Sequence, residues 1–279
     1  MPESELASYI RRNVTSSLEE DINTGDLSAQ LLPATLISTA HISTRQRGVL
    51  CGTPWFDACF RMQDPNCKIN WLAKDGDKID AGQTLCEVQG HTRALLSAER
   101  SALNFLQTLS GTATRTRLYV DAVAGINVKI MDTRKTFPGL RQAQKYAVRV
   151  GGGHNQRIGL FDGILIKENH IAAAGGIKPV LEQAFRLARP GISVQIEVET
   201  LAQLDEALNA GAELILLDNF DLDTLRAAVQ HTGKRAELEA SGGITLENLR
   251  EVALTGVGRI SIGSLTKDVQ TIDLSMRFA

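Results

Sequence analysis

The segment between Asp132 and Arg157 concentrates positive charge. It carries six lysine and arginine side chains, and no acidic residue follows Asp132 until residue 162. Clustered guanidinium and ammonium groups suit a ligand with several anionic groups, because arginine binds a carboxylate or a pyrophosphate through paired hydrogen bonds. The six cations are Arg134, Lys135, Arg141, Lys145, Arg149 and Arg157. Their density predicts a binding site for a small polyanion.

Spacing separates these cations into two groups. Arg141, Lys145 and Arg149 stand four apart in "GLRQAQKYAVRV", so we expect them on one solvated face of a helix. Arg134 and Lys135 instead end an expected strand, where a solvated helical face cannot explain them. These two are therefore the first candidates for ligand binding.

Lys167 belongs to "GILIKENH", an otherwise apolar strand. A buried amine must pair with an anion or change its pKa. Lys167 joins Arg134, Lys135 and Arg157 as the fourth cation expected at one site. The same pattern also fits the Schiff-base lysine of a class I aldolase acting on phosphorylated sugars, and this is the main alternative mechanism.

Two carboxylates end neighbouring expected strands. Glu197 and Asp218 can both face the basic cluster, where they suit Mg²⁺ held jointly with a phosphorylated substrate, or ribose-like hydroxyls. The alternative is that they only neutralise the nearby cations. Glu199 has the same strand parity as Glu197, so alternation alone does not choose between them.

Glycines follow the last two expected strands, in "EASGGIT" and "SIGSLT". Glycine lets backbone N–H groups approach a ligand closely, and late loops of a barrel often bind phosphate in this way. A simple turn is the alternative explanation. The candidate phosphate-binding residues are Ser241, Gly242, Gly243, Gly263 and Ser264.

From residue 126 onward, short apolar strands alternate with helical segments. The expected strands are "INVKIM", "GILI", "SVQIEV", "ELILL", "AELEA" and "RISI". Each runs into polar residues at its C-terminal end, which is how barrel enzymes build an active site at one mouth. An open doubly wound sheet binds chiefly at one switch point, so the pattern favours a parallel α/β barrel.

The first part of the chain has a different pattern. "ATLISTAHIST" and "GQTLCEVQGH" read as strands separated by turns, which predicts an antiparallel α+β unit. A long helical segment follows, with Ser97 as its expected N-cap and Gly111 as a possible break. We therefore expect a domain boundary near residue 110.

The composition excludes several classes of protein. The chain has 279 residues, 43% hydrophobic content and a net charge of −2, which argues against a nucleic-acid-binding protein. It shows no signal-peptide pattern and no apolar run of the roughly 18 residues that span a bilayer, so we expect a cytoplasmic protein without membrane association. The four cysteines lack metal-site spacing and are expected to be reduced thiols.

Together these motifs resemble the quinolinate phosphoribosyltransferase family, decarboxylating type II phosphoribosyltransferases of NAD biosynthesis. The resemblance covers nearly the whole chain. It rests on "LEEDINTGDLS", "DGDKIDAGQTL", "AERSALNFLQTLSG", "MDTRKTFPGLR", "QKYAVRVGGG", "LIKENHI", "LILLDNF" and "GSLTKDVQTIDLSMRF", which occur in this order. It implies transfer of phosphoribosyl from phosphoribosyl pyrophosphate (PRPP) to quinolinate, giving nicotinate mononucleotide, CO₂ and pyrophosphate.

The resemblance also implies an architecture. An N-terminal α/β sandwich would span residues 1–110 and an incomplete α/β barrel of about seven strands residues 111–268. Residues 269–279 would return to the N-terminal domain. Two copies would pair head to tail as a homodimer, with Arg100 of "AERSALN" reaching the site of the neighbouring subunit.

Site roles follow from the same motifs. Arg134, Arg157 and Lys167 would bind quinolinate, and Thr133 and Gln156 would also contact substrate. The phosphate-binding residues above would hold the 5′-phosphate of PRPP.

The catalytic residues implied by the resemblance bind the rest of PRPP. Lys135 and Lys167 would lie near the pyrophosphate, while Glu197 and Asp218 would bind Mg²⁺ and the ribose hydroxyls. These four side chains are the implied catalytic set, and Mg²⁺ is the implied cofactor.

The chain departs from the family at one position. Where the family usually reads Asn-His-Arg, this sequence has Asn155, Gln156 and Arg157. A glutamine amide can donate a hydrogen bond but cannot carry charge or transfer a proton. His154 is two residues earlier and is expected to point elsewhere. A paralogue that acts on or binds another aromatic acid is thus a third interpretation.

Overall fold

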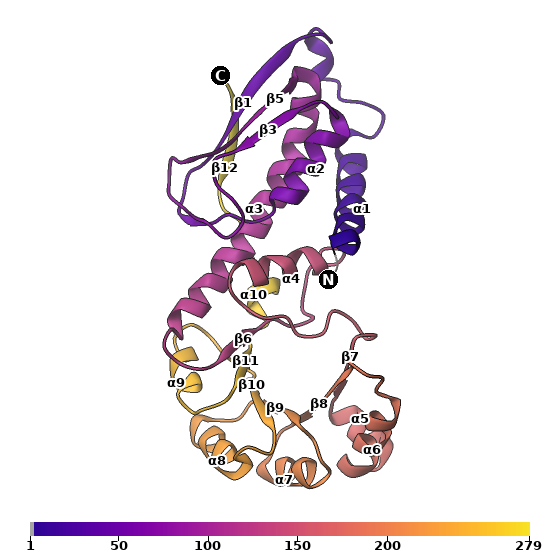
Figure 1. Ribbon diagram of the computed structural model, residues 1–279, viewed down its shortest axis with the longest axis vertical. Helices are drawn as coiled ribbons and strands as arrows, with labels where there is room; N and C mark the ends of the chain where they lie inside the picture. The colour runs from indigo at the N-terminus through magenta and orange to yellow at the C-terminus, as the bar shows by residue number, and fades with distance from the viewer. Residues whose placement is uncertain (1–2) are drawn as a thin grey trace. The chain divides into compact units, whose positions relative to one another are not determined.

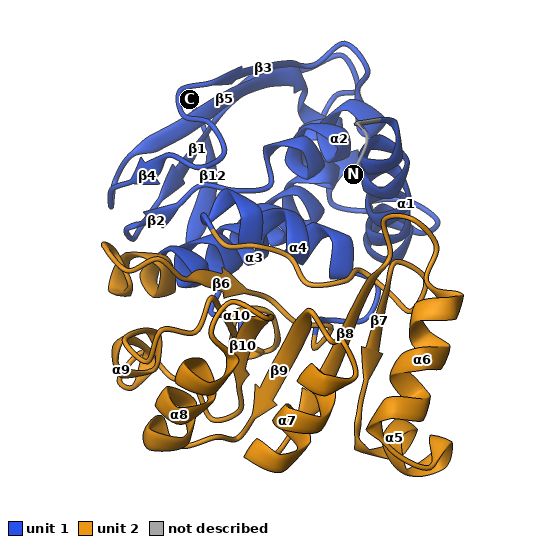
Figure 2. Cartoon of the chain, turned by 60° about the horizontal axis from the view of Figure 1, so that its bottom comes forward, with its two compact units in different colours: residues 1–117, 136–152, 268–279 blue, residues 118–135, 153–267 orange. Residues whose placement is uncertain are grey.

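The computed structural model describes residues 3–279, and the chain forms two compact units (Figure 2). Unit 1 comprises residues 1–117, 136–152 and 268–279, and unit 2 comprises residues 118–135 and 153–267. The prediction placed residues 136–152 in the barrel, whereas in the structure they belong to unit 1.

Unit 1 is built on a four-stranded antiparallel sheet with the order β12-β1-β5-β3 (Figure 1). The strands are β1 (Ile37–Thr44), β3 (Lys68–Trp71), β5 (Thr84–His91) and β12 (Leu274–Phe278). Along β1, Ala40, Ile42 and Thr44 are buried while the residues between them are not, which is the alternation of a strand with one face on a core. The C-terminal strand pairs with β1, so both ends of the chain contribute to this unit.

Helices supply the other layer of unit 1. They are α1 (Glu3–Ile22), α2 (Thr53–Gln63), α3 (Thr92–Ala122), whose last turn falls in unit 2, and α4 (Arg141–Val150). A short helix, η1 (Ala29–Leu31), and the strand pair β2 (Gly48–Val49) and β4 (Lys78–Ile79) complete the unit. Aromatic side chains fill the space between the layers, with Trp55, Phe56 and Phe60 of α2 almost completely buried.

Two expectations for α3 are wrong. Ser97 is not its N-cap, because the helix begins at Thr92 and the Ser97 hydroxyl donates to Asp26 at 2.8 Å from inside the helix. Gly111 does not break the helix. A Cβ added there would lie 2.2 Å from the carbonyl oxygen of Gln270, so the glycine lets the C-terminal segment pass close to the helix.

The assignment of α4 to unit 1 follows from its contacts. Ala143 and Ala147 belong to the hydrophobic core of that unit, and the Tyr146 hydroxyl donates to Asp75 at 2.8 Å. The predicted solvated face of Arg141, Lys145 and Arg149 is wrong for Lys145, which is only 2% exposed. A helix packed along a wide face buries a position that charge spacing alone assigns to solvent.

Unit 2 contains six parallel strands joined by helices. The strands are β6 (Lys129–Met131), β7 (Gly163–Ile166), β8 (Ser193–Val198), β9 (Leu214–Asp218), β10 (Glu237–Ser241) and β11 (Arg259–Ser261). The helices are α5 (Glu168–Ala174), α6 (Ile177–Leu187), α7 (Leu201–Asn209), α8 (Leu222–Thr232), α9 (Leu249–Ala253) and α10 (Ser264–Lys267). The six expected strands are confirmed within one or a few residues at their ends.

Strand order identifies the architecture. The strands are ordered β6-β11-β10-β9-β8-β7. This is the order of strands around a barrel that is open between β6 and β7, the first two strands of the unit. In a doubly wound sheet the strand order would reverse at a switch point, and no such reversal occurs here. The barrel prediction is therefore confirmed. The ring stays incomplete, because the segment after α4 pairs with β6 only through the bridge between Met131 and His154. The expected seventh strand is reduced to this bridge.

Two further expectations concern membranes and cysteines. No helix within residues 3–279 combines the length and the apolar content that crossing a bilayer requires. Cys51, Cys59, Cys67 and Cys86 are all buried in unit 1 and unpaired as thiols. Burial raises the pKa of Cys59 to about 12, so this thiol stays protonated and unreactive.

The close approach at Gly111 gives a test of the fold. Replacing an exposed glycine inside a helix by alanine usually raises the free energy of unfolding by about 1 kcal/mol. At the crowded position of Gly111 the same replacement should lower it. We expect Gly111→Ala to lower the free energy of unfolding in urea by about 1–3 kcal/mol, because the C-terminal segment must shift. The exposed Asn104→Ala on the same helix is the control. An unchanged or higher stability for Gly111→Ala would contradict this packing.

Candidate functional site

A pocket of about 270 Å³ lies in unit 2 at the carboxyl ends of the barrel strands. Strand alternation turns every second side chain toward it, so Leu165, Leu216 and Ser261 line it while their neighbours face the helices. Most of the site residues predicted from the sequence line this pocket: Thr133, Arg134, Lys135, Gln156, Arg157, Lys167, Glu197, Asp218 and Ser241.

Two arginines dominate one wall of the pocket. Burial, and then repulsion from Arg134, lower the pKa of Arg157, so the two guanidinium groups lie close enough to oppose each other. Arg157 donates to the carbonyl oxygen of Gly163 at 3.1 Å. The buried Nε of Arg134 has no hydrogen-bond partner among the described residues. An unsatisfied buried cationic donor next to a second cation is suited to a dianionic ligand.

The loop after β6 is fixed by hydrogen bonds to its backbone. The Lys135 N–H donates to the Thr133 hydroxyl at 3.0 Å, and the Thr266 hydroxyl donates to the Lys135 carbonyl at 2.8 Å. Gly263 lies beside this loop, where a Cβ would be 3.1 Å from Cδ of Lys135. The two loops that follow neighbouring strands β6 and β11 therefore meet at the Lys135 side chain.

The segment that carries Arg157 is anchored by a buried carboxylate. Asp132, which is fully buried, accepts hydrogen bonds from the Asn155 side chain at 2.6 Å and the Gln156 N–H at 2.7 Å. His154 is exposed and pairs with Met131 through its backbone. His154 does not line the pocket, in agreement with the expectation that it points elsewhere.

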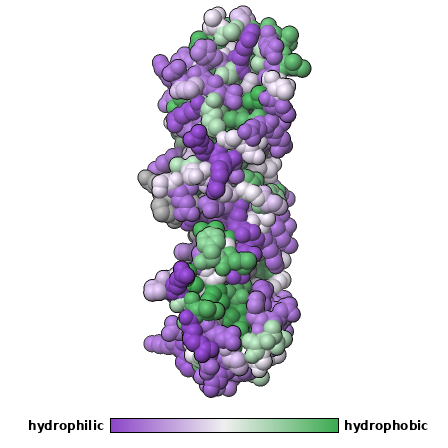
Figure 3. Space-filling model, turned by 90° about the vertical axis from the view of Figure 1, so that its right-hand side faces the viewer, coloured by the Kyte–Doolittle hydropathy of each residue, from purple (hydrophilic) through white to green (hydrophobic). Residues whose placement is uncertain are grey.

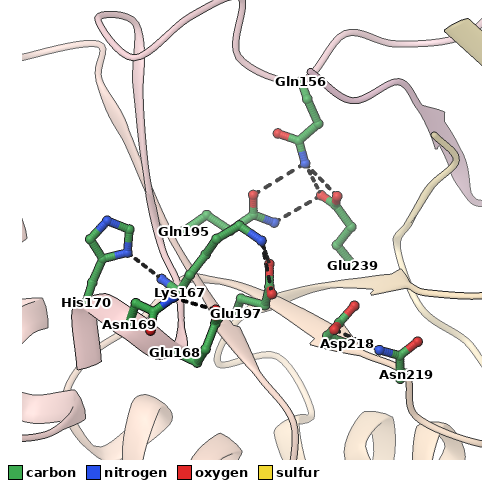
Figure 4. A network of polar contacts seen from close by, with 10 residues as sticks. All are labelled: Gln156, Lys167, Glu168, Asn169, His170, Gln195, Glu197, Asp218, Asn219 and Glu239. Atoms are coloured by element: carbon green, nitrogen blue, oxygen red, sulfur yellow. Dashed lines mark hydrogen bonds and ion pairs between the residues drawn. The ribbon is translucent and has the colours of Figure 1, made fainter. Parts of the chain in front are cut away.

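Carboxylates also line the pocket, and Figure 4 shows Glu197 and Asp218 together with Lys167. The Lys167 ammonium lies 2.9 Å and 3.2 Å from the two Glu197 oxygens. Glu197 lines the pocket, while Glu199 lies beyond the end of β8 with an exposed side chain. The structure thereby distinguishes two residues that strand parity leaves equivalent.

Asp218 ends β9 next to this ion pair. Burial raises the pKa of its carboxyl, while Lys167 and Lys135 act in the opposite direction. Asn219 donates to one Asp218 oxygen at 2.8 Å, which helps to hold the carboxylate toward the pocket. Asp218 thus lies close enough to Lys167 and Lys135 for both ammonium groups to act on its carboxylate.

Sequence reasoning missed a polar cluster that includes Glu239, which also lines the pocket. Glu239 is fully buried and accepts hydrogen bonds from the side-chain amides of Gln156 and Gln195 (Figure 4). Burial raises the pKa of Glu239, and these donors oppose that rise. The sequence did contain a sign of this cluster. In the apolar strands "AELEA" and "SVQIEV", Glu239 and Gln195 each lie two residues before a predicted site residue and so face the same side of the sheet.

The glycine loops border the pocket without lining it. Gly242 allows Asn219 to approach closely, because a Cβ there would lie 2.1 Å from the Asn219 side-chain oxygen. Gly243 has a φ of +60° and an exposed backbone. Ser264 begins α10, and its hydroxyl lies 3.4 Å from that of Tyr119. Arg100 belongs to unit 1, where its side chain is exposed on α3.

The metal-binding capacity of the pocket is limited. Among residues 3–279, no group of three or more histidine, cysteine or acidic side chains has an arrangement that could hold a metal ion. Magnesium differs from zinc in that it commonly binds one or two carboxylates together with substrate phosphates and water. Glu197 and Asp218 fit that pattern, so a magnesium ion here would depend on a phosphorylated ligand.

Comparison with known proteins covers nearly the whole chain. The family model for the N-terminal domain of quinolinate phosphoribosyl transferase matches residues 26–110, and the model for its C-terminal domain matches residues 112–277. A probable nicotinate-nucleotide pyrophosphorylase (carboxylating) of Bacillus subtilis is 45% identical over 257 residues, covering 92% of this chain and 89% of its own. The enzyme of that name from Mycobacterium leprae is 42% identical, covering 95% and 96%.

A solved structure agrees with these matches. The nicotinate-nucleotide pyrophosphorylase from Francisella tularensis superposes with a TM-score of 0.95 at 43% sequence identity, covering 100% of this chain and 98% of that one. Both family models, the relatives and the fold lead to one conclusion. The chain belongs to the quinolinate phosphoribosyl transferase family.

Proposed function

We propose that this protein transfers phosphoribosyl from PRPP to quinolinate and decarboxylates the product, giving nicotinate mononucleotide, CO₂ and pyrophosphate. The observation that carries the proposal is the buried Nε of Arg134, which has no partner among the described residues and lies beside Arg157. Quinolinate presents two adjacent carboxylates on one aromatic ring. Such a dianion would satisfy both guanidinium groups and reduce their mutual repulsion.

The pocket also supplies an apolar surface for the aromatic ring. Leu165 and Leu216 line it together with the charged residues. Arg134, Arg157 and Lys167 would hold the two carboxylates, with Thr133 and Gln156 beside them. Fixing the ring in this way aims its nitrogen at C1 of the ribose, which converts an encounter of two anions into a reaction within one site.

PRPP would occupy the remaining walls. Lys135 and Lys167 would face the departing pyrophosphate, and Glu197 and Asp218 would accept hydrogen bonds from the ribose hydroxyls. The ribosyl carbon gains positive character as pyrophosphate leaves, and fixed carboxylates stabilise that charge. The 5′-phosphate would be held by Ser241, Gly242, Gly243, Gly263 and Ser264.

Magnesium is part of the proposal because Glu197 and Asp218 suit an ion that is shared with phosphate oxygens. When bound, it would neutralise charge that develops on the pyrophosphate. The side chains themselves hold the ribose and the leaving group in place. Asp218 must be ionised for this role. Burial raises the pKa of its carboxyl, and Lys167 and Lys135 oppose that rise.

Decarboxylation would follow from the new bond. The ring nitrogen becomes a quaternary pyridinium, so the electron pair left when the adjacent carboxylate departs as CO₂ is stabilised next to a positive charge. A desolvated pocket favours this loss, because the dispersed charge of the transition state needs less water than a carboxylate does. The carbon then takes up a proton to give the nucleotide.

The aldolase interpretation loses its support at Lys167. A Schiff-base lysine attacks a carbonyl with its side-chain nitrogen, whereas the Lys167 nitrogen is paired with Glu197 at 2.9 Å. Membership of the transferase family also argues against that alternative. The paralogue interpretation is decided by the choice of acid in the assay described below.

A homodimer completes the proposal, with Arg100 reaching the site of the partner subunit. Figure 3 displays apolar side chains gathered on part of the face drawn there. Unit 2 also exposes several large apolar residues, and such surfaces commonly mark protein contacts. They include Leu160, Phe161 and Leu187, which are 75%, 76% and 75% exposed. A cytoplasmic location stays a prediction from the sequence.

The reaction itself is the first test. With Mg²⁺ and PRPP, the protein should release CO₂ and pyrophosphate from quinolinate in equal amounts and make no nucleotide from nicotinate, which lacks the second carboxylate. Chelation by EDTA should abolish both products, and excess Mg²⁺ should restore them. Turnover of nicotinate without CO₂ release would favour the paralogue interpretation.

Arg134 should be indispensable for binding of the acid. Arg134→Ala removes charge-assisted hydrogen bonds. We expect kcat/KM for quinolinate to fall about 100-fold, which corresponds to a loss of transition-state stabilisation on the order of 3 kcal/mol. Arg186→Ala, at an exposed position on α6, is the matched control and should keep normal kinetics. Full activity in Arg134→Ala would remove this residue from the site.

Sharing of sites can be tested by mixing variants. Arg100→Ala should lose activity while its thermal unfolding stays unchanged, because its side chain is exposed. In mixed dimers of Arg100→Ala with Arg134→Ala, one site of each dimer keeps both arginines if Arg100 acts in the partner. Partial recovery of activity is therefore expected. Confirmed mixed dimers without recovery would argue against the trans role.

A further inference from the structure

Buried Glu239 and Gln195 form a polar cluster with the half-buried Gln156 in the interior of unit 2 (Figure 4). Nε2 of Gln156 lies 2.5 Å and 2.6 Å from the two Glu239 oxygens and 3.3 Å from Oε1 of Gln195. Nε2 of Gln195 donates to Glu239 at 3.0 Å. The cluster thus joins β10, β8 and the segment after the bridge at His154.

The chemistry of the cluster fixes the orientation of its amides. An ionised carboxylate only accepts hydrogen bonds, so each glutamine must turn its nitrogen toward Glu239. The oxygen of Gln195 then accepts from Gln156. A buried carboxylate that lost one of these donors would be left with an unmet acceptor, which makes the arrangement costly to disturb.

The segment that Gln156 belongs to is held by hydrogen bonds from several sides, among them those of the Ile158 and Gly159 N–H groups to Asp162. Beyond the single bridge at His154, residues 155–157 take no part in the parallel sheet, whose opposite edge is β7. Asp132 holds the segment from the side of β6, through the Gln156 N–H and the Asn155 side chain. Glu239 holds it from the opposite side of the interior, through the Gln156 side chain. Arg157 is the next residue in the chain.

We propose that Glu239 and Gln195 are positioning residues for the aromatic acid. Through the amide of Gln156 they hold the segment that presents Arg157 beside Arg134, in place of the strand hydrogen bonds that the open barrel lacks. Neither residue is required to touch substrate for this role. The inference rests on the proposed function, and it predicts a selective effect on quinolinate because PRPP is bound chiefly by other residues.

Glu239→Gln is the first variant. The variant keeps the shape of the side chain, but one carboxylate oxygen is replaced by an NH₂ group that cannot accept a hydrogen bond. We expect KM for quinolinate, and the dissociation constant for quinolinate measured by calorimetry, to rise roughly 10- to 100-fold, while KM for PRPP changes less than about twofold. Hydrogen exchange of residues 154–158 should become faster.

The matched control is Glu237→Gln on the same strand. Glu237 also faces the interior, but it forms ion pairs with Lys129 at 3.0 Å and with Arg259 and does not line the pocket. Its replacement removes an equal charge two residues away. We expect unchanged KM values for both substrates and unchanged exchange of residues 154–158.

Gln195→Met keeps the test decisive if Glu239→Gln fails to fold. Methionine has a similar shape but neither donates to Glu239 nor accepts strongly from Gln156, so a selective rise in KM for quinolinate is again expected. If the variants alter both KM values equally, or lower only the melting temperature, the cluster is merely structural and the inference is wrong. A wild-type protein inactive on quinolinate would instead overturn the proposed function.

Discussion

Repulsion between Arg134 and Arg157 is the constraint on which the site depends. Both guanidinium groups line one small pocket, Arg157 is partly desolvated, and the buried Nε of Arg134 has no partner among the described residues. Such an arrangement is unfavourable in the protein alone, because like charges in a region of reduced dielectric repel strongly. A ligand with two negative charges would relieve this repulsion, which is why we propose these two arginines as the binding site of the dianionic acid.

Three carboxylates hold the cations of the pocket and the segment that carries Arg157. Glu197 pairs with Lys167, Asp132 binds the backbone of the segment before Arg157, and Glu239 binds the side chain within it. Each carboxylate lies at the end of a strand or inside one. Because the strands are parallel, their carboxyl ends meet at one edge, and residues far apart in the sequence act on the same pocket.

The incomplete barrel explains why this scaffolding is needed. A closed barrel would hold every strand by hydrogen bonds on both edges, whereas here the segment around His154 pairs with β6 alone. The side chains of Asp132 and Glu239 form hydrogen bonds to this segment where a neighbouring strand would otherwise do so. The departure from the family at Gln156 fits the same arrangement, because a neutral amide can still donate to Glu239.

The sequence by itself determined the local features of this protein. The six strands of unit 2, their polar carboxyl ends and the cations after β6 follow from periodicity and residue type, because alternation and burial act over a few residues. Only the tertiary structure decided the burial of Lys145, the place of α4 in unit 1 and the close contact that requires a glycine at residue 111. It alone joined Gln156 to Glu239 and Gln195. These outcomes depend on strand register and on packing between segments distant in sequence, and no local pattern encodes which side chains such contacts bring together.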